Sequence, residues 1–491
     1  MKRLSSYFYI GFLLVFLMSC EKDDNIEEDP VVPVVEDDEL EVEEFIFRGM
    51  EEFYLYEADI AALQDGFFED DSEKKTFLGS FDSPEELFYD LTIPSDQFSF
   101  ITDDYNALND SFDGKSGATG MEYGIGRITG TSRLFGFITY ILPGSSAEEA
   151  GLERGTVFTE INGTALTDGN YLELLREKSF TINIGSVDEE GYLVLTDETV
   201  ELEDRPYTSN PIFLYEIMEF DEKKIGYLIY NSFIGDFDDE LNAVFGEFKS
   251  AGIDDLILDL RYNGGGSVMS AVDLASMITG QFEGEVFMKE QWNERYQTYF
   301  ETYEPERILN YFDSQIRTGE AINSLHLSEI YILTGYQTAS ASELIINGLR
   351  PYINVIQIGE ETTGKFQGSI TLYDAPNFDE ENANPDHTYA LQPLVFTSAN
   401  VNGETGYMDG LYPDIEEPEM LNNMGVLGDQ EEPLLKTTLD IILDRPQPMM
   451  MRRMSIEQSR FEIIGGKELI DQNSQRMYLE KTPPKVIWDQ E

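Results

Sequence analysis

The sequence predicts a multidomain α/β protein whose largest unit is a mostly parallel sheet covered by helices. Four short apolar runs have the composition of buried strands: residues 225–230, 256–260, 331–334 and 352–358. Helical segments separate these runs, at residues 238–250, at residues 271–278 and immediately before Pro351. Strands that alternate with helices are typical of a parallel sheet. With 491 residues and 41% hydrophobic content, the chain has room for about three domains.

The charge balance is strongly acidic. The chain has 96 acidic and 32 basic residues, which gives a net charge of −64. Proteins that bind nucleic acid neutralise phosphates with Lys and Arg, so this balance argues against a nucleic-acid partner. The acidic residues are spread along the chain and indicate a solvated surface that favours solubility.

Residues 1–19 have the features of a signal peptide. Lys2 and Arg3 precede an apolar stretch, residues 7–18, that is short for a membrane span. The stretch ends in Leu-Met-Ser-Cys, which resembles the signal box of bacterial lipoproteins, and Cys20 is the one cysteine in the chain. The resemblance implies a lipid anchor on Cys20, at the periplasmic or cell-surface face of the outer membrane in a bacterial cell envelope. A plain secretory signal with an unrelated cysteine is the alternative.

The next two segments are expected to be a tether and a helical domain. Residues 20–40 are acidic and contain two prolines, which indicates a disordered tether. Within residues 41–110, apolar side chains recur at helical spacing from residue 45 to residue 54, and Ser83-Pro84 before two glutamates is typical of a helix start. We therefore expect an N-terminal helical domain at residues 41–110.

Residues 117–204 resemble a PDZ domain, which is rich in β structure. An apolar strand, a short helix and a tight Asn-Gly turn follow one another at residues 137–163. PDZ domains bind a peptide C-terminus by adding it as a strand and holding its carboxylate on backbone N–H groups. The resemblance places the peptide-binding segment at Tyr123, Gly124, Ile125 and Gly126. A packing module of the same shape without a ligand is the alternative.

Residues 210–446 are expected to form the core, with its chemistry in residues 331–369. A strand and a tight turn carry Ser340 to the start of a helix, and the next strand leads through a glycine turn to Lys365. Neighbouring parallel strands end at the same edge of a sheet, so the two side chains can meet there. Burial lowers the pKa of a lysine and lets it act as the base that activates a serine. A turn serine and a surface lysine are the alternative, which composition alone favours.

Two motifs resemble those of the C-terminal processing peptidases, the tail-specific serine/lysine proteases of family S41. One is Thr-Ala-Ser-Ala-Ser-Glu-Leu followed by Lys365, and the other is Asp-Leu-Arg-Tyr-Asn-Gly-Gly-Gly at residues 259–266. The resemblance implies that Ser340 is the nucleophile and Lys365 the general base, on an α/β core of the crotonase/ClpP-like type. It also implies an oxyanion hole made by backbone N–H groups of a glycine in the second motif and of the residue after the serine: Gly264, Gly265 and Ala341.

One position departs from the family pattern. Many members have a glutamine four residues after the lysine, where it orients the amine, and this chain has Ser369 there. Gln367 lies two residues after the lysine, so Gln367 and Ser369 are both candidates to orient Lys365.

Together these features predict a serine endopeptidase whose PDZ-like domain gates the site or collects the C-terminal tails of protein substrates. The alternative is a catalytically silent envelope lipoprotein that binds peptides or another ligand. The sequence contains no metal-ligand spacing or phosphate loop, so no metal and no cofactor is implied. Residues 291–325 are expected to be an insertion that shapes the substrate cleft, and residues 447–491 an irregular or mobile tail.

Overall fold

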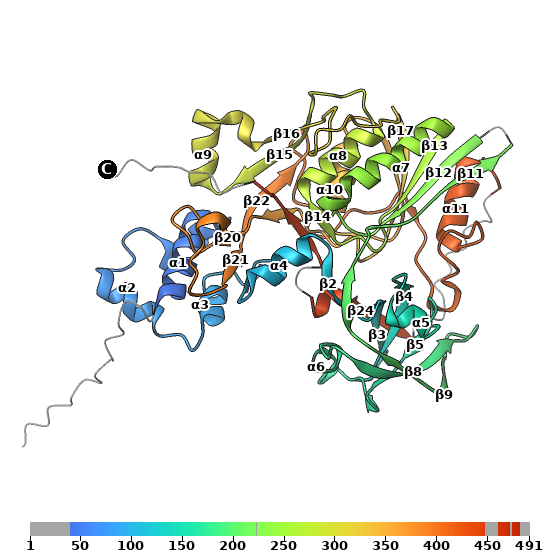
Figure 1. Cartoon of the computed structure of the whole chain (residues 1–491), viewed down its shortest axis with the longest axis horizontal. Coiled ribbons are helices and arrows are strands. Elements are labelled where there is room, and N and C mark those ends of the chain that lie inside the picture. The colour runs from blue at the N-terminus through green and yellow to red at the C-terminus, as the bar shows by residue number, and fades with distance from the viewer. Residues whose placement is uncertain (1–39, 222, 447–459, 472–473, 482–491) are drawn as a thin grey trace, which may run out of the picture.

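The computed structural model of the protein describes residues 40–221, 223–446, 460–471 and 474–481. Figure 1 shows three parts: a helical part in blue, a small β domain in green, and a larger α/β core in which helices lie on a sheet. The predicted signal peptide, Cys20, the tether up to residue 39 and the methionine-rich start of the tail all lie outside the described residues.

The N-terminal part is helical, as predicted. Its main helices are α1 (Glu41–Phe53), α2 (Asp71–Leu78), α3 (Pro84–Asp90) and α4 (Tyr105–Phe112). Helix α1 buries its apolar side chains, and the Ser83 hydroxyl accepts a hydrogen bond from the Glu86 N–H to cap α3. The chain then forms β1 (Phe100–Thr102), which joins a small sheet with β21 (Ala390–Gln392) and β20 (Leu372–Tyr373) of the core.

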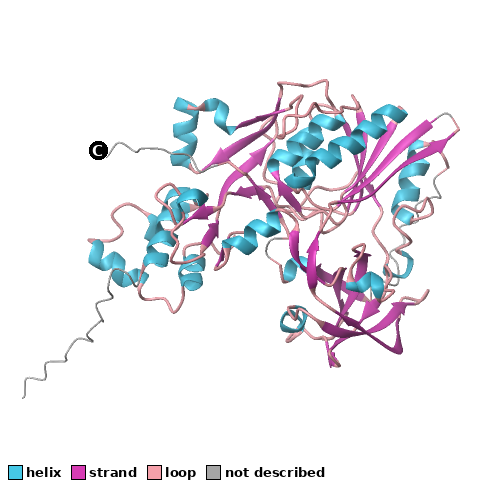
Figure 2. Ribbon diagram, in the orientation of Figure 1, coloured by secondary structure: helices cyan, strands magenta, loops and turns pink. Residues whose placement is uncertain are grey.

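The small β domain comprises residues 115–208. Its elements are β2 (Lys115–Ala118), β3 (Met121–Ile128), β4 (Leu134–Ile141), α5 (Ser146–Glu149), β5 (Val157–Phe158), β6 (Glu160–Ile161), β7 (Thr164–Ala165), α6 (Tyr171–Leu175), β8 (Phe180–Val187), β9 (Leu193–Leu202) and β10 (Arg205–Thr208). The predicted Asn-Gly turn joins β6 to β7, with positive φ at Asn162 and Gly163. Figure 2 shows this domain as mostly strand.

The main sheet of the core confirms the predicted parallel arrangement. Its strand order is β11 (Ile212–Phe220), β12 (Lys223–Tyr230), β13 (Asp255–Asp259), β17 (Glu329–Thr334), β18 (Asn354–Gly359) and β23 (Ile415–Glu416). The five strands β12, β13, β17, β18 and β23 run parallel to one another. Strand β11, at the edge of the sheet, is antiparallel to β12.

Alternate residues of each strand point to opposite faces of this sheet, and both faces carry apolar side chains, so helices cover both faces. The row Leu228, Leu258 and Ile332 packs with the helices α7 (Asp238–Ala251), α8 (Val268–Ile278) and α10 (Ala341–Leu349). The neighbouring row of Tyr227, Ile257 and Tyr331 packs with α11 (Pro433–Ile442).

A second sheet contains strands that the sequence did not reveal. Its order is β14 (Gly265–Ser267), β25 (Arg476–Tyr478), β19 (Gln367–Ser369), β22 (Leu394–Ala399), β15 (Val286–Trp292) and β16 (Leu309–Tyr311). Strand β25 belongs to the C-terminal tail, and so does β24 (Phe461–Gly466), which pairs with β3 of the small β domain. The tail was predicted to be irregular and packed, or mobile; its described residues are packed, but as strands paired with distant strands rather than as irregular backbone.

The predicted insertion at residues 291–325 packs against the N-terminal part, and its role in shaping the substrate cleft stays a prediction. It contains α9 (Glu294–Tyr303), which lies against the N-terminal helices. The Tyr296 hydroxyl donates to Glu52 Oε1 at 2.6 Å, and the Tyr296 ring stacks on Phe53 with 5.1 Å between centroids. The segment thus joins the core to the N-terminal part.

Candidate active site

Ser340 lies at the turn between β17 and α10, in a strained conformation. Its φ angle is +65°, which is rare for a residue with a side chain. The turn is held by a hydrogen bond from the Ala339 N–H to the Asn263 carbonyl. Ser340 is fully buried, and its Oγ has no hydrogen-bond partner among the described residues. An unpaired buried hydroxyl on a strained turn is typical of a functional position.

Lys365 lies at the start of the segment that leads into β19. It is 3% exposed, and its Nζ lies 4.5 Å from the centre of the Phe98 ring. Burial lowers its pKa to about 7; the charge of Asp96 opposes this shift and that of Arg476 adds to it. The Lys365 Nζ donates a hydrogen bond of 2.6 Å to the Gln475 carbonyl of the C-terminal tail. An amine in this state can accept a proton near neutral pH.

The carboxylate of Glu343 connects the serine turn to the lysine turn. Its Oε2 accepts hydrogen bonds from the Ser340 N–H at 2.7 Å and from the Lys365 N–H at 2.9 Å. Its Oε1 accepts from the Gly364 N–H at 2.7 Å and from the Thr362 hydroxyl at 2.5 Å. Burial raises the pKa of Glu343 to about 7, although these four bonds oppose the shift. Because one oxygen binds both backbones, the structure brings Ser340 and Lys365 side by side.

Sequence reasoning missed this role of Glu343, which it noted only as one residue of the motif that contains Ser340. The signal is weak, since carboxylates are common in the first turn of a helix for reasons of helix capping alone. The complete burial of Glu343 distinguishes it, and burial depends on the tertiary fold.

The glycine loop after β13 lies against the serine turn. A Cβ on Gly265 would lie 2.7 Å from the Ser340 Cβ and 2.9 Å from the Ala341 nitrogen, so only glycine fits there. The Gly265 N–H donates to Asn263 Oδ1 at 2.8 Å, which commits this N–H within the loop. Of the two glycines considered as oxyanion donors, Gly265 thus has its N–H paired within the loop in this structure.

Neither candidate for orienting the lysine bonds its amine among the described residues, although Gln367 Oε1 is buried without a hydrogen-bond partner there. The Gln367 Nε2 donates to the Tyr56 hydroxyl at 3.2 Å, and the Ser369 hydroxyl donates to the Met477 carbonyl at 3.3 Å. The amine of Lys365 is instead held by the backbone carbonyl of Gln475. A main-chain partner from a remote segment leaves no signature in the sequence.

The four residues expected to bind a peptide lie on β3. The chain's own strand β24 pairs antiparallel with them, in the register Gly466 with Gly124, Gly465 with Ile125 and Ile463 with Gly126. The fourth residue, Tyr123, is buried in the core of the small β domain. The edge that we expected to be open to a peptide is therefore already paired.

A buried ionic cluster joins the small β domain to the strand that carries the glycine loop. Arg261 donates to Glu432 Oε1 at 2.7 Å and to Asp259 Oδ1 at 3.0 Å. Arg154 of the small β domain pairs with Glu419, which also accepts a hydrogen bond from Tyr262. Burial alone would raise the pKa of Glu419, but Arg154 and Arg261 hold it below its ordinary value. The cluster fixes the Asp-Leu-Arg-Tyr segment between the two parts.

The described residues contain neither a group of three His, Cys, Asp or Glu side chains placed to bind a metal ion nor a helix long and apolar enough to cross a membrane.

Comparison with known proteins identifies two family domains in the chain. The model of peptidase family S41 matches residues 224–388, and that of the peptidase S41 N-terminal domain matches residues 41–100.

Similar sequences carry protease names. The chain is 26% identical over 245 residues to a carboxyl-terminal-processing protease of Picosynechococcus sp., a match that covers 48% of this chain and 52% of that protein. It is 25% identical over 237 residues to a CtpA-like serine protease of Staphylococcus aureus strain COL, covering 46% of this chain and 41% of that protein. The chain thus spans about half the length of the curated relatives it matches.

Solved structures agree with the fold. An S41 protease from Bacteroides fragilis superposes with a TM-score of 0.62 at 26% identity, covering 82% of this chain and 97% of the other. The photosystem II D1 C-terminal processing protease gives a TM-score of 0.51 at 18% identity, covering 82% of this chain and 100% of the other. The second likeness concerns the fold alone.

Proposed function

We propose that the protein is a serine endopeptidase of the C-terminal processing type, with Ser340 as nucleophile and Lys365 as general base. The observation that carries this proposal is the shared carboxylate of Glu343, which fixes the backbones of both residues on one oxygen atom. The depressed pKa of Lys365 and the unpaired Oγ of Ser340 support it. The protease names of the relatives agree with this chemistry.

The mechanism begins when neutral Lys365 takes the proton of the Ser340 hydroxyl, and Oγ attacks the carbonyl carbon of a substrate peptide bond. The N–H groups of Gly264 and Ala341 stabilise the oxyanion. The protonated lysine then gives its proton to the leaving amine, and the acyl-enzyme forms. Water, deprotonated by the same lysine, attacks the ester and releases the new C-terminus.

The small β domain would act as a PDZ module that selects substrate. A peptide would add along the edge of β3 that β24 occupies in this structure, after β24 has left it, with backbone hydrogen bonds supplying affinity. The ionic cluster of Arg154, Glu419 and Arg261 joins this domain to the strand that carries the glycine loop. A shift of the domain would therefore displace the backbone N–H groups proposed to bind the oxyanion. We expect protein substrates to be recognised by their C-terminal tails.

The test compares the protein from residue 21 onwards with Ser340→Ala and Lys365→Met on fluorescein-labelled casein. A fluorophosphonate probe reports the reactivity of Ser340 independently of turnover. Both substitutions should abolish cleavage, and Ser340→Ala should also abolish labelling, while circular dichroism shows an unchanged fold. Persistent cleavage by Lys365→Met would require another base. Absence of labelling and cleavage under all conditions would favour the silent binding lipoprotein.

The cellular location follows from the N-terminus. We propose that Cys20 carries a lipid anchor that holds the enzyme on the bacterial cell envelope. Incorporation of radiolabelled palmitate, lost in Cys20→Ser, would support this proposal, and a protein that is released unlabelled from the cells would contradict it.

A further inference from the structure

The described part of the C-terminal tail, residues 460–471 and 474–481, connects the small β domain to the catalytic centre. At its first end, β24 runs antiparallel along β3 towards Gly124. The Phe461 ring lies 4.8 Å from that of Phe135, while Ile464 and Leu469 pack against the core of the domain. This is the manner in which a bound peptide strand would lie on the domain.

At its second end, the tail enters the catalytic centre. Strand β25 lies between β14, which follows the glycine loop, and β19, which follows Lys365, and it is parallel to both. A Cβ on Gly264 would lie only 1.9 Å from the Ser474 carbonyl oxygen, so tail backbone covers the glycine loop. The Gln475 carbonyl binds the amine of Lys365.

In this arrangement the tail keeps a substrate from reaching Ser340 and Lys365, the proposed catalytic dyad. The Ser340 side chain is fully buried and unpaired, and the Lys365 amine is engaged by a carbonyl other than that of a substrate. A scissile carbonyl must lie near Ser340 and near the N–H groups of the glycine loop. The backbone of residues 474–476 already covers that loop.

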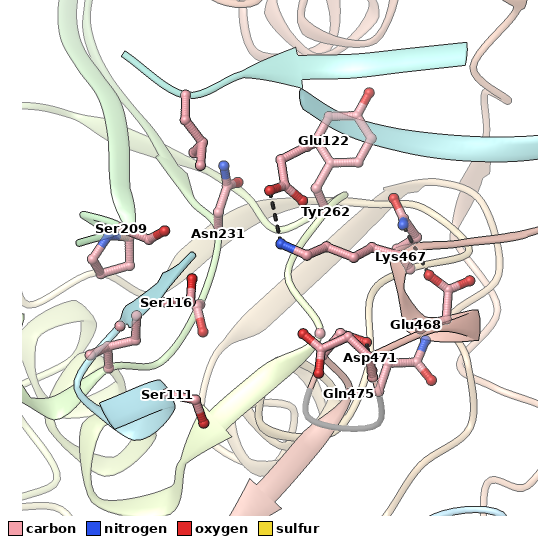
Figure 3. A pocket seen from close by; sticks show the side chains of 18 of the residues that line it. Ser111, Ser116, Glu122, Ser209, Asn231, Tyr262, Lys467, Glu468, Asp471 and Gln475 are labelled. Atoms are coloured by element: carbon pink, nitrogen blue, oxygen red, sulfur yellow. Dashed lines mark hydrogen bonds and ion pairs between the residues drawn. The ribbon is translucent and has the colours of Figure 1, made fainter. Parts of the chain in front are cut away.

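A charged cavity of about 190 Å³ lies beside this path (Figure 3). Its walls come from the small β domain through Glu122, from the core through Tyr262 and Gly264, and from the tail through Lys467, Glu468 and Gln475. In Figure 3, Lys467 reaches across the cavity to Glu122, with 3.0 Å between Nζ and Oε1. Movement of the tail would therefore join this cavity to the catalytic centre.

We propose that the described tail residues 461–471 and 474–478 occupy the path of the substrate polypeptide, so that the resting enzyme is latent. The inference rests on the proposed peptidase function. The substrate is an extended polypeptide that displaces the tail, runs from the edge of β3 to the glycine loop, and adds between β14 and β19 as the missing strand. Backbone pairing on both sides selects unfolded chains over folded ones.

The tail cannot simply be cut off to test this, because Met477 and Leu479 are buried in the core and their loss would expose it. Two substitutions at the far end loosen the tail without touching the dyad. Lys467→Ala removes the ion pair with Glu122, and Phe461→Ser removes the contact with Phe135. Lys436→Ala in α11 is the matched control, since it removes an exposed lysine ion pair, with Glu431, that lies outside the tail.

The rates of fluorophosphonate labelling and of casein cleavage are measured for each form. We expect both loosened variants to react at least tenfold faster than the unmodified protein and Lys436→Ala to react like it. A synthetic peptide of residues 461–481 should inhibit the loosened variants competitively, while a scrambled peptide should not. Adding Ser340→Ala to each variant should abolish labelling.

Three results would overturn the inference. Equal rates in the unmodified protein and in both folded, loosened variants would show that the tail does not close the site, while the peptidase itself would stand. Slower reaction in the loosened variants would make the tail a part that completes the site, with Gln475 positioning Lys365. Absence of labelling in every form would remove the peptidase function and the latency together.

Discussion

The pKa of Lys365 gives the sharpest test of the dyad. A lysine with the ordinary pKa of 10.5 is neutral in about one molecule in 3,000 at pH 7, whereas one with a pKa of about 7 is neutral in half of them. The catalytic rate should therefore rise about tenfold between pH 6 and pH 8, as the neutral amine accumulates. The sign follows from burial, which disfavours the charged form.

Asp96 allows the environment of the amine to be changed. Its negative charge raises the pKa of Lys365, so Asp96→Asn should lower that pKa further and move the midpoint of the titration to a pH below 7. Asp96 Oδ1 accepts hydrogen bonds from the N–H groups of Phe98 and Ser99, and the side-chain oxygen of an asparagine can accept the same two bonds. Asp90→Asn, on the exposed surface of α3, is the control and should leave the titration unchanged.

The measurement is the pH titration of the ¹³Cε signals of isotopically labelled lysines by nuclear magnetic resonance. The signal lost in Lys365→Met identifies the residue in the resting protein, independently of activity. A midpoint near 10, or a midpoint that Asp96→Asn leaves in place or raises, would refute the assignment of Lys365 as a base that is neutral near pH 7.

Three further predictions concern residues that hold the site in place. In Glu343→Gln, the amide nitrogen replaces one accepting oxygen and faces at least one buried N–H donor. We therefore expect a loss of about 1–3 kcal/mol in the free energy of unfolding, measured by thermal unfolding, and unchanged stability would contradict the pairing. Gly265→Ala places a Cβ 2.3 Å from the Arg476 carbonyl oxygen and should lower kcat/KM about 10²-fold, whereas Gly284→Ala, also at positive φ but in open space, should not. Glu432→Ala leaves Arg261 short of a buried partner and should cost about 3–5 kcal/mol in urea unfolding; a cost below that of the surface variant Glu431→Ala would show that the pair carries no stability.

The sequence was most informative where a single segment determines its own structure. The apolar runs that became β12, β13, β17 and β18 are long enough to show their period, and the helices between them have clear apolar faces. The motifs around Ser340 and Lys365 identified the candidate pair because their spacing matched a known family, whereas the glutamate that joins them was one motif residue with no role assigned to it.

The second sheet could not be predicted for a physical reason. Strands β14, β19 and β25 have three residues each, which is too short for a hydrophobic period to appear. Their pairing joins Gly265 with Arg476 and Ser369 with Tyr478, partners separated by more than a hundred positions, and backbone hydrogen bonds carry no residue code. The partner of the Lys365 amine, a main-chain carbonyl in the tail, was hidden for the same reason.

The shared carboxylate of Glu343 has a consequence for motion within the enzyme. Two catalytic groups on independent loops would fluctuate separately, and the distance between them would vary with both movements. Here the backbone N–H groups of Ser340 and Lys365 both donate to Glu343 Oε2, so a displacement of one turn would move the other with it. If the surrounding domains rearrange to admit a polypeptide, the proposed nucleophile and base would keep their spacing.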